Sequence, residues 1–206
     1  MNRMNKAARS GGTGGLRRTT ALSLFTAIIA VLSVLQNFVR FGPFPITLAL
    51  APIIVGAALY GRKAGAYLGG VFGVVTLITG IFGWDGGAVM YLLSQNFLAL
   101  IFVCIGKGVF AGYCSGLIYE LLAKKNDHLG VLAAGIVCPV ANTGFFVAGM
   151  LVFFTSALES WAGGEAMLYY IIFGLTGINF LVELAVNLVL SSGITTIINY
   201  GKGRHR

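Results

Sequence analysis

Long apolar stretches without charged residues follow one another along the chain, separated by short charged or glycine- and proline-rich segments. A helix that crosses the hydrocarbon core of a bilayer, about 30 Å thick, needs roughly 20 such residues. The stretches therefore predict an all-α fold, a polytopic bundle of six transmembrane helices. The six are Thr19–Val39, Ile46–Tyr60, Ala64–Phe82, about Phe97–Ala123, Leu129–Phe154 and about Met167–Tyr200.

The composition excludes the common soluble classes of protein. Only 10% of the 206 residues are charged and 57% are hydrophobic, whereas a soluble domain carries about 25% charged residues. The net charge of +8 does not indicate a nucleic-acid partner, because the basic residues form short clusters between apolar stretches. No nucleotide-binding motif, zinc-ligand spacing or nucleophile–base pair is present, so we expect no enzyme, no metal and no cofactor.

The distribution of positive charge predicts the orientation of the helices. Every Lys and Arg except Arg40 and Lys107 falls in the tails or in loops that six crossings place on one side. Such loops stay in the cytoplasm, so we expect both termini inside. We expect a disordered basic tail over residues 1–18 that contacts membrane lipid, a membrane domain over 19–200 and a second basic tail over 201–206.

The segment from Gly86 to Ala123 is too long for one straight crossing at about 1.5 Å per residue. We expect residues 84–96 to form an outer loop or a short capping helix, followed by a single crossing. Two crossings in this segment are the competing interpretation. The neighbouring apolar stretches carry glycines at four-residue spacing, which are Gly61, Gly65, Gly69 and Gly73, then Gly108, Gly112 and Gly116. This spacing favours close helix packing within the chain, with a surface for a partner protein as the alternative.

Two ionisable residues, Lys107 and Glu183, lie at bilayer depth, where charges are costly and usually face a bundle interior or a cavity. One interpretation is a buried ion pair that sets the helix register. The other is a polar cavity lined by Lys107, Asn142 and Asn179, in which the cation neutralises an anionic ligand. Thr176, Asn179 and Glu183 recur at spacings of three and four, so they share one helix face.

Aromatic residues are frequent in the loops on the predicted outer side. Phe44 lies in the first of these loops, and Trp84 and Asn96 bound the third. Part of this pattern is typical of anchoring at the membrane interface. The remainder predicts a lid over an apolar pocket with a few polar groups, which is typical of small-molecule binding.

Several motifs resemble the substrate-binding (S) subunits of energy-coupling factor (ECF) transporters, most of all the pantothenate-type members. They are FPITL at 44–48, APIIVGA at 51–57, YGRKAG at 60–65 and PVANTGFF at 139–146. The resemblance implies a six-helix fold in a bacterial cytoplasmic membrane that binds a vitamin near its outer face. It also implies three partner chains, namely a membrane coupling (T) subunit and two cytosolic ATPases. Docking on the T subunit would use small residues of the first helix, here Ser23, Ala27 and Ala30.

The prediction from the sequence is therefore a substrate-capture subunit of an ATP-driven vitamin importer. Pantothenate, which carries a carboxylate, hydroxyls and an amide, would suit Lys107, Asn142 and Asn179. Riboflavin, folate or a pyrimidine precursor of thiamine are alternative ligands. Alternative functions are a solitary facilitator, an intramembrane enzyme, or a structural subunit in which Lys107 and Glu183 only lock the helices.

Overall fold

The computed structural model describes residues 2–38 and 47–203, and over these residues it is all-helical, as predicted. The helices are α1 (Asn2–Leu35), α2 (Leu50–Tyr60), α3 (Arg62–Ile81), α4 (Ala88–Gln95), α5 (Phe97–Leu122), α6 (Asp127–Phe153), α7 (Thr155–Ala162), α8 (Met167–Tyr169) and α9 (Ile178–Gly203). A 3-10 turn, η1 (Gln36–Phe38), ends α1, and a π-helical segment, η2 (Tyr170–Gly177), precedes α9.

Five helices are long and apolar enough to cross a membrane, within the residues that the structure describes. They are Gly15–Phe38, Arg62–Ile81, Phe97–Leu122, Asp127–Phe153 and Met167–Leu190. The sixth predicted crossing is α2, whose 11 residues extend only about 16 Å at about 1.5 Å per residue. A count of six complete crossings therefore stays a prediction. α1 begins at Asn2, inside the segment for which the sequence indicates a disordered tail.

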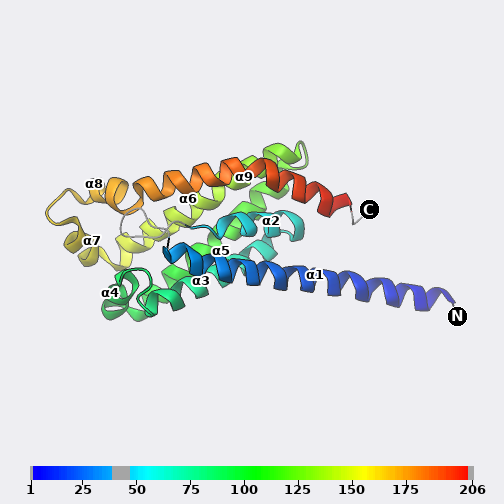
Figure 1. The fold of residues 1–206 in the computed structure, drawn as a ribbon, viewed down its shortest axis with the longest axis horizontal. Coiled ribbons are helices and arrows are strands. Elements are labelled where there is room, and N and C mark those ends of the chain that lie inside the picture. Colours follow the sequence, from blue (N-terminus) through cyan, green and yellow to red (C-terminus); the bar gives the residue numbers. More distant parts are fainter. Residues whose placement is uncertain (1, 39–46, 204–206) are drawn as a thin grey trace.

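The helices form one elongated bundle (Figure 1). The start of α1 and the end of α9 lie at one end of the bundle, and α4, α7 and α8 lie at the other. α4 has eight residues, which is too few to cross a membrane. The segment between residues 84 and 123 thus contains a short capping helix and one membrane-length helix, as predicted, and the interpretation with two crossings is wrong.

α3 and α5 pack backbone against backbone along their glycines, which we call the glycine seam: Gly65, Gly69 and Gly73 of α3 with Gly108 and Gly112 of α5. A Cβ atom at Gly69 would collide with the carbonyl oxygen of Gly108, and one at Gly65 with that of Gly112. Glycines at this spacing let membrane helices approach closely, where van der Waals contact drives association. The predicted packing within the chain is confirmed.

The turn between α2 and α3 lies toward the end of the bundle where α1 starts and α9 ends. Gly61 has a φ of +88°, a backbone conformation that other residues rarely adopt. Glu120 of α5 accepts a hydrogen bond from the backbone N–H of Arg62 (2.9 Å), and the Arg18 guanidinium donates to the carbonyl oxygen of Tyr60 (3.2 Å). These hydrogen bonds connect the end of α2 and the turn after it to α1 and α5.

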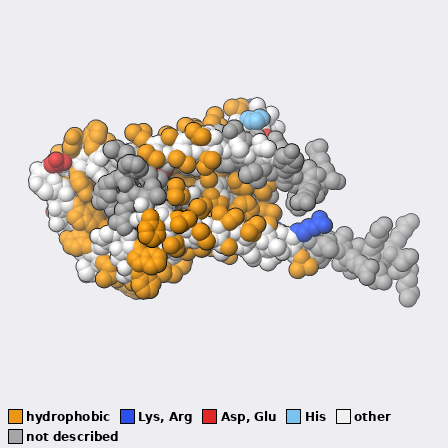
Figure 2. Space-filling model, in the orientation of Figure 1, with side chains coloured by type: hydrophobic (Ala, Val, Ile, Leu, Met, Phe, Trp, Pro, Cys, Tyr) orange, Lys and Arg blue, Asp and Glu red, His pale blue; other side chains and the backbone are white. Residues whose placement is uncertain are grey.

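The outer surface is apolar over the middle of the bundle. Figure 2 shows hydrophobic side chains covering this region on the face in view, with charged side chains toward the two ends. Large apolar side chains such as Leu24, Phe102 and Val189 are 57–76% exposed. An exposed apolar belt of this kind needs hydrocarbon rather than water around it, as in an integral membrane protein.

Replacing Gly69 by Ala is expected to destabilise the protein by about 1–3 kcal/mol, because the added methyl group overpacks the glycine seam. Gly144→Ala is the matched control, since a Cβ at this exposed position of α6 meets no atom within 4 Å. Thermal unfolding in detergent, followed by tryptophan fluorescence, measures the difference. Equal melting temperatures of the two variants would contradict the packing described for α3 and α5.

Candidate functional site

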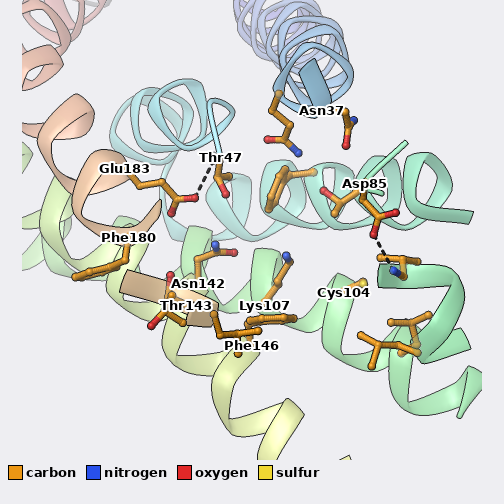
Figure 3. A pocket seen from close by; sticks show the side chains of 18 residues that line it. Asn37, Thr47, Asp85, Cys104, Lys107, Asn142, Thr143, Phe146, Phe180 and Glu183 are labelled. Atoms are coloured by element: carbon orange, nitrogen blue, oxygen red, sulfur yellow. Dashed lines mark hydrogen bonds between the residues drawn. The ribbon is translucent and has the colours of Figure 1, made fainter. Parts of the chain in front are cut away.

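A cavity lies in the half of the bundle that is remote from the chain termini. Its walls come from η1, the entry to α2, α3, α4 and the turn before it, α5, α6, η2 and α9. The 18 lining residues are Gln36, Asn37, Thr47, Phe72, Thr76, Asp85, Val89, Leu92, Leu100, Cys104, Lys107, Asn142, Thr143, Phe146, Leu175, Thr176, Phe180 and Glu183 (Figure 3). Apolar walls with a few polar groups are typical of a small-molecule site.

Lys107 of α5 points into this cavity between two aromatic rings. Its ammonium nitrogen lies 5.7 Å from the ring centroid of Phe72 and 5.2 Å from that of Phe146. Such cation–π contacts attract the ammonium without neutralising it. Within the described part of the chain, no carboxylate oxygen lies within 4.0 Å of it, so the ion pair with Glu183, one of the two interpretations of the sequence, is not formed. Lys107 therefore presents positive charge to the cavity.

Asn142 lies on α6 and is 5% exposed. It follows Pro139 inside this helix, and a proline removes one backbone hydrogen bond and bends the helix beside it. In Figure 3 the side chains of Asn142 and Lys107 point in the same direction, toward the part of the cavity where Thr47 and Asn37 lie. The structure thus brings together two of the predicted site residues.

The two carboxylates of the cavity are already engaged by backbone N–H groups. Asp85 accepts hydrogen bonds from Gly87 (3.0 Å) and Val89 (2.7 Å) at the start of α4. Glu183 of α9 accepts one from Thr47 (2.8 Å), so it joins the last helix to the entry of α2. Both carboxylates hold pieces of the cavity wall in place.

The π-helical segment η2 brings Thr176 to the cavity. Its hydroxyl donates to the carbonyl oxygen of Ile171 (2.7 Å), five residues earlier. π-Helical turns are rare and frequently occur at functional sites. Thr176 and Glu183 both line the cavity, as their spacing predicts. The side chain of Asn179 lies outside the described residues, and so does Phe44.

Two further predicted binding residues lie away from the cavity lining. Asn96 caps α5, where its side-chain oxygen accepts a hydrogen bond from the backbone N–H of Ala99 (3.0 Å). Trp84 is 47% exposed, with its ring 6.2 Å from that of Phe82. On α1, Ser23 and Ala27 are exposed and Ala30 is half-buried, so the predicted docking residues lie on or beside the outer face of this helix.

Sequence reasoning missed several polar residues that line the cavity. Gln36 and Asn37 form a polar pair within the first apolar stretch, and this pair was the available signal. Thr76 and Thr143 gave little signal, because a hydroxyl is common in membrane helices and often bonds its own backbone. Asp85 lies in the segment 84–96, for which the sequence predicts only an outer loop or a short capping helix.

Replacing Asp85 by Ala is expected to loosen α4, because the backbone N–H groups of Gly87 and Val89 lose their acceptor. The loss of such a cap costs about 0.5–2 kcal/mol. Amide hydrogen exchange over residues 88–95, followed by mass spectrometry, should become faster in this variant. Glu159→Ala is the control, because this carboxylate on α7 is exposed. Unchanged exchange in α4 would show that the cap is not needed there.

Comparison with known proteins adds a family and two relatives. Residues 17–195 match the family described as ECF transporter, substrate-specific component. The pantothenic acid transporter PanT of Lactococcus lactis subsp. cremoris (strain MG1363) is 25% identical over 183 residues, which cover 84% of this chain and 89% of PanT. The solved structure of ThiT from Listeria monocytogenes has a similar fold, with a TM-score of 0.61 at 20% sequence identity. That match covers 90% of this chain and 98% of ThiT.

Proposed function

The chain belongs to the substrate-specific components of ECF transporters, and from this premise we propose that it captures pantothenate for an ATP-driven vitamin importer. It supplies the binding site, and the importer's other subunits supply the energy. Its role is therefore binding rather than catalysis. Separate observations support the ligand, the orientation and the partners.

The observation that carries the ligand proposal is the ammonium group of Lys107, which faces the cavity without a carboxylate partner within 4.0 Å in the described residues. A cation held at membrane depth without a counter-charge favours an anionic ligand. Pantothenate supplies a carboxylate for Lys107, and its amide and hydroxyls suit the amide of Asn142. The similarity to PanT supports the same ligand.

The proposed orientation places both termini in the cytoplasm of a bacterial cell, with α2 as the sixth crossing. The start of α1 and the end of α9 lie at the same end of the bundle (Figure 1), which supports an even number of crossings. Basic residues gather in the tails and in the loops toward that end, as cytoplasmic segments do. The cavity lies in the opposite half and therefore opens toward the outside.

The proposed partners are a membrane coupling subunit and two cytosolic ATPases. The chain contains no nucleotide-binding motif, so ATP hydrolysis must be supplied by other chains. We propose that α1 docks on the coupling subunit through the face that carries Ser23 and Ala27, with Ala30 beside it. Small side chains let a second membrane helix approach closely.

Lys107→Met is expected to weaken pantothenate binding by about 10- to 100-fold, since a charge-assisted hydrogen bond contributes about 1.5–3 kcal/mol. Binding of pantothenol, in which an alcohol replaces the carboxylate, should change little. Titration of tryptophan fluorescence in detergent measures both affinities. Lys63→Met, at an exposed position of α3 near the other end of the bundle, is the control. Equal losses for both ligands would show that Lys107 has a structural role.

Reconstituted alone in liposomes, the protein is expected to bind pantothenate without accumulating it. Addition of the coupling subunit, both ATPases and ATP should start uptake, because the chain has no energy source of its own. Uptake of radiolabelled pantothenate measures the difference, and vesicles that contain the Lys107→Met variant report the background. Saturable uptake by the chain alone would favour a solitary facilitator.

A further inference from the structure

Two sets can be distinguished among the polar groups that line the cavity. One set already has hydrogen-bond partners within the protein. Besides Asp85 and Glu183, it contains Asn37, whose side-chain amide donates to the carbonyl oxygens of Ser33 (3.0 Å) and Val34 (3.2 Å). A ligand that bonded to these groups would have to displace contacts that hold the walls together.

The second set is buried and has no hydrogen-bond partner among the described residues. It consists of the side-chain oxygens of Gln36, Thr76 and Asn142. Gln36 and Asn142 are only 2% and 5% exposed. A buried polar atom without a partner destabilises a folded protein, and native proteins contain few of them. Three such atoms around one cavity therefore mark positions where a bound molecule completes the hydrogen bonding.

These three residues come from separate elements that surround Lys107. Gln36 is the first residue of η1, Thr76 lies on α3, and Asn142 lies on α6, while Lys107 projects from α5. The carboxamide oxygens accept hydrogen bonds, and the hydroxyl of Thr76 accepts or donates. A ligand that satisfies the set carries one anionic group and at least two hydrogen-bond donors.

We infer that Gln36, Thr76 and Asn142 are the specificity-determining residues of the cavity, which bind the hydroxyl and amide groups of the ligand while Lys107 binds its anionic group. The inference rests on the proposed function for the location of the site. Its substrate class is a hydroxylated, amide-containing monocarboxylate. Glu183 and Asp85 then shape the wall without binding the ligand.

Apolar replacements of similar size separate this role from a structural one. In Gln36→Met, Thr76→Val and Asn142→Leu, the unpartnered polar atom is removed, so the melting temperature of the ligand-free protein should stay the same or rise. Pantothenate affinity should fall about tenfold or more in each variant, because the ligand's own polar groups then lack partners. Asn37→Leu is the matched control for stability, since it breaks two existing hydrogen bonds and should lower the melting temperature.

A second ligand tests whether the three residues bind the hydroxyl groups of pantothenate. An N-acyl-β-alanine of the same chain length that lacks both hydroxyls should bind the wild-type protein at least tenfold more weakly than pantothenate does. The three replacements together should weaken its binding less than they weaken the binding of pantothenate. Isothermal titration calorimetry on the full-length protein in detergent measures these affinities.

The outcomes distinguish the two proposals. If the wild-type protein binds pantothenate and all three variants bind it equally well, the assignment of these residues is overturned. The proposed function then still stands. A decrease in melting temperature that parallels the decrease in affinity would also overturn the assignment, because the side chains would then be structural. Absence of saturable binding of pantothenate to the wild-type protein would overturn both proposals.

Discussion

The close contact of α3 with α5 along the glycine seam is the constraint on which the rest of the structure depends. Inside a membrane there is no hydrophobic drive between helices, so association depends on tight van der Waals contact. Gly69 and Gly108 allow the two backbones to touch. Lys107 directly precedes Gly108, and Phe72 lies about one turn after Gly69 on α3, with its ring facing Gly108. The seam thereby fixes the positions of Lys107 and of the Phe72 ring beside it.

The cavity shows two uses of polar groups in an apolar environment. Asp85 and Glu183 accept hydrogen bonds from the backbone N–H groups of wall segments, which offsets part of the cost of burying polar groups. We propose that Lys107, Gln36 and Asn142 instead bind the ligand. Under this proposal, one set of groups holds the cavity walls together and the other set recognises the polar ligand.

In this family the fold does not by itself determine which ligand is bound. The likeness to ThiT at 20% identity shows that a very different sequence adopts the same arrangement of helices. Ligand choice then depends on a small number of side chains in a shared framework. In the present chain the side chains that we propose to bind the ligand lie on η1, α3, α5 and α6, so the proposed site forms only when these four elements are packed together.

The sequence by itself determined that the protein is helical and lies in a membrane, because apolar length and the placement of charges are local properties that follow directly from the cost of exposing polar groups to lipid. It also identified Lys107, Asn142 and Glu183, since polar residues stand out in apolar stretches. Only the tertiary structure decided which groups these residues contact. Whether Lys107 pairs with Glu183, or whether Gln36 lacks a partner, depends on contacts between helices far apart in the sequence. Those distances are set by packing, and no local pattern encodes them.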